Sequence, residues 1–93
     1  MGIATSRWDV TEHLDSPEAI AAYLEAAIEE DDPAFFRKAL SDVARAKGMS
    51  QVARDAGITR PALYKALGEG GNPSMATVMG VMKALGVKLA VAA

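Results

Sequence analysis

A series of helix-start and helix-stop signals constrains the fold of this 93-residue chain more than any other feature. Ser16 and Asp32 each precede a proline, and both side chains can accept hydrogen bonds from first-turn amides while proline suits the first helical position. Further segments begin after a serine or threonine and end at a glycine, the residue best able to take a left-handed conformation. The pattern predicts five helices, at 17–28, 33–47, 51–56, 60–67 and 75–85, with Ser50, Thr59 and Ser74 as the later caps.

The apolar residues repeat with helical spacing and predict which faces are buried. Aromatic residues make up only 5% of the chain, so the core must consist of Ala, Val, Leu, Ile and Met side chains. We treat the methionines as core filler, not as ligands. The expected buried stripes are Ile20, Leu24, Ala27 and Ile28; then Phe36, Leu40, Val43 and Ala44; then Met75, Val78, Met79, Met82 and Leu85.

The period changes after Gly86, where Val87, Leu89 and Val91 alternate with other residues and predict a short strand. A lone strand is unstable, and the only other candidate is Trp8–Leu14, so pairing can occur within one chain or between two. We expect an all-α fold of five helices with short N- and C-terminal strands. It would comprise an acidic strand-and-helix extension at 1–32 and a helix-turn-helix domain with the C-terminal strand at 33–93.

Residues 49–67 carry the most functional information, because they fit a helix-turn-helix. Ala53 is small enough for two helices to cross closely, and Gly57 suits the sharp turn between them. The alternative is an ordinary helical hairpin with a glycine turn. The agreement of the caps, the glycine, the basic outer face and the inward apolar set favours the helix-turn-helix; that inward set is Val52, Ala56, Ile58, Leu63 and Ala66.

The exposed amino end of the second helix in this motif has side chains suited to a DNA major groove. Arg60 has the fork that matches the two acceptors of guanine, whereas Lys65 suits a phosphate. Tyr64 can contact phosphate or a thymine methyl, or be a half-buried surface aromatic. Thr59 caps this helix. Gln51 and Asn72 are uncharged donors placed to hold phosphates on either side, although Asn72 also suits a turn.

Charge is divided sharply along the chain, although the formal net charge is only −2. Residues 1–32 contain one basic and nine acidic side chains, a formal charge of −8, and residues 33–93 contain nine basic and three acidic ones, a formal charge of +6. This asymmetry suggests a polyanion as the partner of the basic part and a basic molecule as the partner of the acidic part. A solvated acidic helix face is the alternative for residues 1–32.

Several classes of function lack support in the sequence. The chain has no cysteine and one histidine, so we expect no metal site, no cofactor and no histidine-dependent hydrolase. The carboxylate pairs are not expected to line a cleft, and we therefore predict that the protein is not an enzyme. No apolar run approaches the roughly 20 residues that span a bilayer, and the first residues are unlike a signal peptide. We expect a cytoplasmic protein that does not bind membranes.

The motif segments together resemble the addiction-module antidote proteins, a branch of the Cro and lambda-repressor-like superfamily. The resemblance covers about 80 residues on comparison of motifs alone. The similar segments are Leu14-Asp-Ser-Pro-Glu-Ala-Ile-Ala-Ala-Tyr-Leu24, Gly48-Met-Ser-Gln51 with the following residues to Arg60, Leu63-Tyr-Lys-Ala-Leu67, Gly71-Asn-Pro-Ser74 and Val81-Met-Lys-Ala-Leu-Gly86.

This resemblance implies an antitoxin of a type II toxin–antitoxin pair. Its partners would be a small basic toxin of the RelE kind, a second copy of the chain and a palindromic operator in double-stranded DNA, which it would repress. Matched position by position, the DNA-facing residues would be Gln51, Thr59, Arg60, Tyr64, Lys65 and Asn72.

The charge division independently offers a surface for a cationic toxin at Glu25, Glu29, Glu30, Asp31 and Asp32, and the C-terminal strand offers Val87, Leu89 and Val91 for pairing between copies. Two alternatives stay open: a stand-alone helix-turn-helix regulator without a toxin, and a protein-interaction module that has lost DNA binding.

Overall fold

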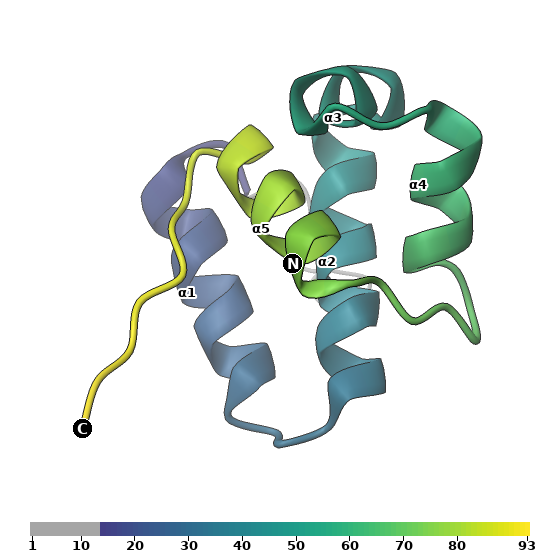
Figure 1. Ribbon diagram of the computed structural model, residues 1–93. Coiled ribbons are helices and arrows are strands. Elements are labelled where there is room, and N and C mark those ends of the chain that lie inside the picture. The colour runs from purple at the N-terminus through teal and green to yellow at the C-terminus, as the bar shows by residue number, and fades with distance from the viewer. Residues whose placement is uncertain (1–13) are drawn as a thin grey trace, which may run out of the picture.

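The computed structural model describes residues 14–93, which form five α-helices. They are α1 (Pro17–Ile28), α2 (Pro33–Lys47), α3 (Met49–Ala56), α4 (Arg60–Leu67) and α5 (Met75–Ala84). Helices α1 and α2 form a hairpin, α3 crosses the end of α2, and α4 and α5 pack around them (Figure 1). The prediction of an all-helical fold with five helices is confirmed for this part of the chain.

Most of the predicted helix starts are confirmed by their hydrogen bonds. The Ser16 hydroxyl accepts from the amide of Ala19 at 3.1 Å, and the Ser74 hydroxyl accepts from Thr77 at the same distance. The predicted start and cap of the third helix are wrong, since α3 begins at Met49 and no side chain caps it, whereas its predicted end at Ala56 is confirmed. Gly48, with φ 117°, lets the chain turn directly from α2 into α3, so Ser50 lies inside the first turn.

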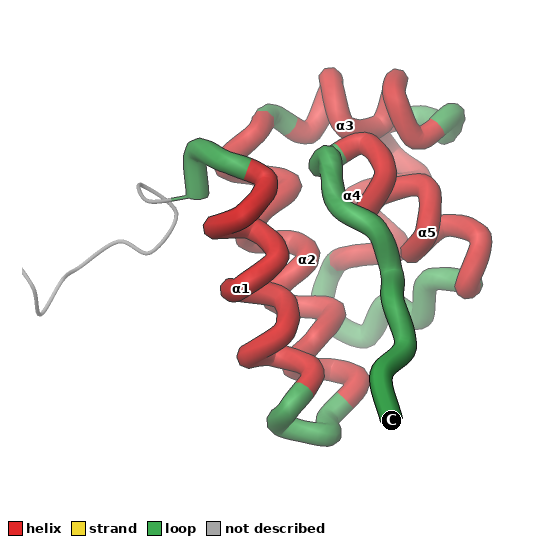
Figure 2. Tube along the Cα trace, turned by 90° about the vertical axis from the view of Figure 1, so that its left-hand side faces the viewer, coloured by secondary structure: helices red, strands yellow, loops and turns green. Residues whose placement is uncertain are grey.

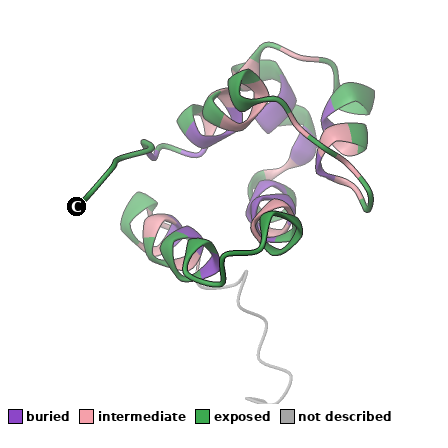
Figure 3. Ribbon diagram, turned by 60° about the horizontal axis from the view of Figure 1, so that its bottom comes forward, coloured by how far each residue is buried: buried purple, intermediate pink, exposed green. Residues whose placement is uncertain are grey.

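The core lies between the α1–α2 hairpin and the three shorter helices, and buried residues face this centre (Figure 3). Leu40, Val52, Leu63 and Val81 are fully buried. Leu67, which the sequence analysis did not place in the inward set, is also buried. Ala53 is buried as expected, whereas Ala56, Ile58 and Ala66 are half-buried.

Two of the predicted buried stripes include residues that are exposed in the structure. Ile28 is 47% exposed because it is the last residue of α1, beyond the buried face of Ile20, Leu24 and Ala27. Met75 and Met79 are 63% and 52% exposed. The face of α5 that meets the core instead contains Val81 and Met82, followed by Leu85. A helix that packs on one side buries a narrow arc, so residues at the edge of an apolar stripe stay in contact with solvent.

The predicted C-terminal strand is absent from the described residues. Residues 87–93 leave α5 without helix or strand, and residues 87–90 run beside α1 (Figure 2). Val87 packs into the core, but a strand also needs a neighbouring backbone for its hydrogen bonds, and no strand partner lies within residues 14–93. The predicted N-terminal strand at Trp8–Leu14 falls almost entirely outside the described residues.

Candidate nucleic-acid interface

Helices α3 and α4 are joined by a tight turn centred on Gly57, which has φ 77°. The amide of Ile58 donates to the carbonyl of Ala53 at 3.0 Å, and the amide of Gly57 donates to Arg54 at 3.2 Å. This pair of bonds is the Schellman arrangement, which ends a helix at a left-handed residue. Thr59 follows in an extended conformation, and its hydroxyl accepts from the amide of Ala62 at 3.1 Å, so α4 starts at Arg60.

Helix α4 buries one side and exposes the other. Leu63 and Leu67 are buried, whereas Arg60, Pro61, Ala62 and Lys65 are exposed. The predicted outer residues Arg60 and Lys65 therefore face solvent. Ala62 was not predicted as a surface residue of interest, although it lies three residues before Lys65 and therefore on the same side of the helix. Its methyl group lies beside the groove that also contains Lys65.

Tyr64 is half-buried, and it lies between two arginines. The Arg60 guanidinium carbon is 5.4 Å from the centre of the ring, and that of Arg45, on α2, is 5.5 Å from it. Arg60 Nη2 also lies 3.5 Å from the Tyr64 hydroxyl. Both arginines are within the range of a cation–π contact. Of the two expectations for Tyr64, the half-buried aromatic matches its burial, and two cations lie over its ring.

The other edge of α4 borders an open groove of about 590 Å³. Lys65 and Asn72 both line this groove, together with Ser74 and Thr77 from the start of α5. Glu69 also lines it and adds a negative charge. Thus the structure brings Lys65 and Asn72 to one concave surface. Gln51 is exposed on the first turn of α3, and within residues 14–93 its side chain makes no hydrogen bond.

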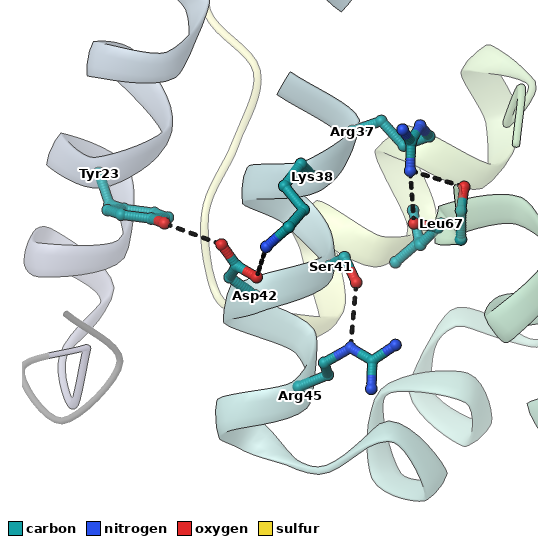
Figure 4. Close-up of polar contacts among 8 residues, drawn as sticks. Tyr23, Arg37, Lys38, Ser41, Asp42, Arg45 and Leu67 are labelled. Atoms are coloured by element: carbon teal, nitrogen blue, oxygen red, sulfur yellow. Dashed lines mark hydrogen bonds and ion pairs between the residues drawn. The ribbon is translucent and has the colours of Figure 1, made fainter. Parts of the chain in front are cut away.

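Arg37, another basic residue of α2, fixes the far end of α4. Its Nη1 donates to the carbonyl oxygens of Leu67 and Gly68 at 2.9 and 2.6 Å (Figure 4). These carbonyls end the helix and have no partner within it. The amino end of α4 is thus set by the Gly57 turn and its carboxyl end by Arg37, so the exposed face between them is held rigidly.

The predicted acidic surface lies at the α1–α2 turn and along α1. Glu25, Glu29, Glu30 and Asp31 are exposed, and within residues 14–93 none of them forms an ion pair. Asp32 differs, because its carboxylate accepts from the amides of Ala34 at 3.0 Å and Phe35 at 3.4 Å and so caps α2.

The segment predicted for pairing between copies is partly exposed. Val87 is buried, whereas Leu89 is 45% and Val91 98% exposed. Leu89 also lines an apolar groove beside Met79 and Met82. The described residues thus contain one extended segment with a buried beginning and an apolar, solvent-exposed end.

Residues 14–93 contain neither a cluster of metal-ligating side chains nor a long apolar helix. No group of three or more His, Asp or Glu side chains there is placed to hold a metal ion. In the same part of the chain, no helix has the length and apolar character needed to cross a bilayer.

Comparison with known proteins gives one family. A model of the family described as "Probable addiction module antidote protein" matches residues 4–93. A protein of Haemophilus influenzae that bears the name "Uncharacterized protein" is 55% identical over 84 residues, which are 90% of this chain and 87% of that protein. No solved structure matches the chain.

Proposed function

Because the chain belongs to the family of probable addiction module antidote proteins, we propose that it is the antitoxin of a type II toxin–antitoxin module. In this proposal it neutralises a small basic toxin of the RelE kind and represses its own operon as a dimer bound to DNA. The observation that carries the DNA-binding part is the exposed, rigidly held amino end of α4, with Arg60 and Lys65 in contact with solvent.

A helix-turn-helix of the Cro and lambda-repressor kind would use this end of α4 in the major groove. Arg60 would contact a base, Lys65 and Asn72 the backbone on one side of α4, and Gln51 the backbone beside α3. Thr59 would hold the helix start against the duplex. Tyr64 would support Arg60 through the contact between its ring and the guanidinium.

Dimerisation gives such a protein its operator spacing. Two copies would present their α4 helices about 34 Å apart, which fits half-sites one helical turn apart on a palindrome. We assign the contact between copies to Val87, Leu89 and Val91, because residues 87–91 are extended and the apolar side chains of Leu89 and Val91 are exposed. The backbone of this segment would gain strand hydrogen bonds from the second copy, and residues 14–93 of its own chain supply none.

DNA binding is tested by titrating fluorescent duplexes from the region upstream of the gene with the full chain. We expect salt-dependent binding to one palindromic duplex. Arg60→Ala should cost about 1–3 kcal/mol and relax the preference at one base position, while Lys65→Ala should weaken all duplexes evenly. Lys38→Ala is the control, since it removes an exposed charge from the α1 side of α2, away from α4. Absence of binding by the unchanged chain would favour a protein-interaction module without DNA affinity.

The acidic surface is the proposed toxin contact, because exposed carboxylates without ion pairs can occupy a cationic surface that otherwise binds RNA phosphates. In this proposal the two parts of the chain have different partners: residues 1–32 would bind the toxin and residues 33–93 would bind DNA. Glu25, Glu29, Glu30, Asp31 and Asp32 are the candidate residues.

A charge-reversal experiment tests this surface, and the structure limits which residues to change. Asp32 caps α2 and Asp31 has φ 59°, so replacing either would also disturb the fold. The variant is therefore Glu25→Lys, Glu29→Lys and Glu30→Lys together. Its control reverses the charge of Asp55 and Glu69, which are exposed and lie within residues 33–93.

We expect the Glu25, Glu29 and Glu30 reversal to abolish co-purification with the small basic protein encoded beside the gene, and the control reversal to preserve it. Equal binding by both variants would overturn the toxin surface. If no such companion is encoded or bound, the chain is a stand-alone regulator.

A further inference from the structure

Arg45 is the residue on the α4 side of the molecule that the proposed function does not yet use. It comes from the last turn of α2, its side chain is exposed, and it lies against the ring of Tyr64. Helix α2 is outside the helix-turn-helix, so nothing in that motif assigns Arg45 a role. Its position nevertheless places a second cation, beside that of Arg60, against the Tyr64 ring.

The Arg45 side chain is held in place from two sides. Its Nε donates to the hydroxyl of Ser41 at 3.2 Å (Figure 4), and Ser41 is buried, with 5% of its surface exposed. Its guanidinium also packs on the Tyr64 ring, with 5.5 Å between the guanidinium carbon and the ring centre. A side chain fixed at its Nε and on one face loses little further conformational entropy when it binds a ligand.

Most of the hydrogen-bonding capacity of Arg45 is unused. A guanidinium has five N–H donors. Within residues 14–93, only the Nε donor has a protein partner, and the four N–H groups of the two terminal nitrogens have none. These four N–H groups lie in the plane of the guanidinium and form the fork that matches two oxygens of a phosphate. The arrangement therefore offers a fixed, exposed anion-binding fork beside the amino half of α4.

We infer that Arg45 binds a backbone phosphate of the DNA duplex that α4 enters. This inference rests on the proposed DNA binding and extends the contact surface from the helix-turn-helix to α2. Ser41 acts as a positioning residue, because it touches Arg45 and not the duplex. A phosphate is favoured over a base edge because Nε is tied to the buried Ser41, which keeps the guanidinium close to α2 and the Tyr64 ring.

The test measures DNA binding as a function of salt concentration, with the palindromic duplex and a random-sequence duplex of equal length. Each phosphate contact contributes about 0.9 to the slope of log K against log salt. Arg45→Ala should lower the slope by about 0.9 per bound copy and weaken binding roughly fivefold per copy at 0.15 M salt, equally on both duplexes. Arg45→Lys keeps the charge and should keep the slope, with part of the affinity lost.

Two further variants separate a phosphate contact from a purely structural role. Ser41→Ala should weaken binding less than Arg45→Ala and leave the slope unchanged, because the cation remains. Lys38→Ala is the charge-matched control on the α1 side of α2 and should leave the affinity within twofold of the unchanged chain. Circular dichroism melting shows that each variant is folded.

Three results would overturn the inference. An Arg45→Ala variant with unchanged slope and affinity would show that Arg45 only packs on Tyr64. Loss of affinity for the palindrome alone would show that it acts in base recognition. If the unchanged chain binds neither duplex, both the proposed DNA binding and this inference are overturned. If Arg45→Ala binds DNA as the unchanged chain does, only this inference is overturned and the proposed function stands.

Discussion

Nη1 of Arg37 donates a hydrogen bond to the carbonyl oxygen of Leu67 at 2.9 Å, which joins the second helix to the last residue of the fourth. The same nitrogen reaches the carbonyl of Gly68 at 2.6 Å. A positive charge at the carboxyl end of a helix is favourable, because the last carbonyls have no partner within the helix and carry partial negative charge. Arg37 therefore couples the orientation of α4 to the α1–α2 hairpin.

Replacing Arg37 with alanine should destabilise the fold by about 1–3 kcal/mol, since two carbonyls lose a charged donor in a partly buried place. Urea unfolding followed by circular dichroism measures this loss. Arg37→Lys keeps one charged donor group and should recover part of the stability. An Arg37→Ala midpoint equal to that of the unchanged chain would contradict the coupling.

Gly71 and Gly57 are both glycines beside α4, but they are required for different reasons. A Cβ atom on Gly71 would lie 2.3 Å from the carbonyl oxygen of Ala66 and 2.7 Å from that of Lys65, so the backbone itself blocks it. Gly57 has open space around it, and only its φ of 77° disfavours other residues. One position is limited by a close approach and the other by backbone conformation.

We predict that alanine at Gly71 costs about 2–3 kcal/mol and alanine at Gly57 about 1 kcal/mol. Asparagine separates the two mechanisms, because it tolerates the left-handed conformation. Gly57→Asn should be more stable than Gly57→Ala, whereas Gly71→Asn should be no better than Gly71→Ala. Urea midpoints of the four variants check this order, and a Gly71→Ala midpoint near that of the unchanged chain would refute the close approach.

The sequence was sufficient to predict elements that depend on local signals. Ser16, Thr59 and Ser74 act within one helical turn, and Gly57 acts through its own φ, so each can be recognised from its neighbours. The exposed face of α4 follows from helical periodicity in the same way. The prediction failed at α3, where Ser50 has the side chain of a helix cap but the backbone turn at Gly48 starts the helix at Met49, ahead of Ser50.

The remaining features depend on contacts between distant residues. Arg45 and Tyr64 are 19 positions apart, and their contact requires the packing of α2 on α4, which no spacing in the sequence encodes. The exposure of Met79 depends on which arc of α5 meets the core, and methionine suits either environment. The alternation after Gly86 is compatible with a strand, but the hydrogen-bonding partner that makes a strand is not a property of the segment itself.

Tyr23 links α1 to α2 by donating its hydroxyl hydrogen to Asp42 at 3.1 Å (Figure 4). Burial raises the pKa of this hydroxyl above its ordinary value of 10.0, and the Asp42 carboxylate raises it further by its charge and by accepting the hydrogen bond. Above pH 10 the unfolded chain therefore releases a proton that the folded chain retains. The stabilisation is complete below pH 10 and is lost as the pH rises through the folded pKa.

Tyr23→Phe should be less stable than the unchanged chain by about 1 kcal/mol near neutral pH, because one partly buried hydrogen bond is lost. This difference should stay constant from pH 7 to about pH 9 and shrink above about pH 10. Urea unfolding of both proteins at a series of pH values measures it. The two proteins share every other titratable group, so a difference that grew with pH would contradict the assignment to Tyr23.

Leu89 offers the sharpest test of the proposed dimer, since its side chain is already half exposed in a single chain. Leu89→Lys should therefore leave the stability of the monomer nearly unchanged but place a charge in the pairing seam, where desolvation opposes it. Ala90→Lys is the matched control: Ala90 is also exposed, and in an extended segment its side chain points to the opposite face. Sedimentation velocity over a range of concentrations should find Leu89→Lys monomeric and Ala90→Lys dimeric.

Because two linked half-site contacts bind far more tightly than one, Leu89→Lys should also lose affinity for the palindrome while keeping its affinity for a single half-site. If the two variants have the same oligomeric state, the seam lies elsewhere on the molecule.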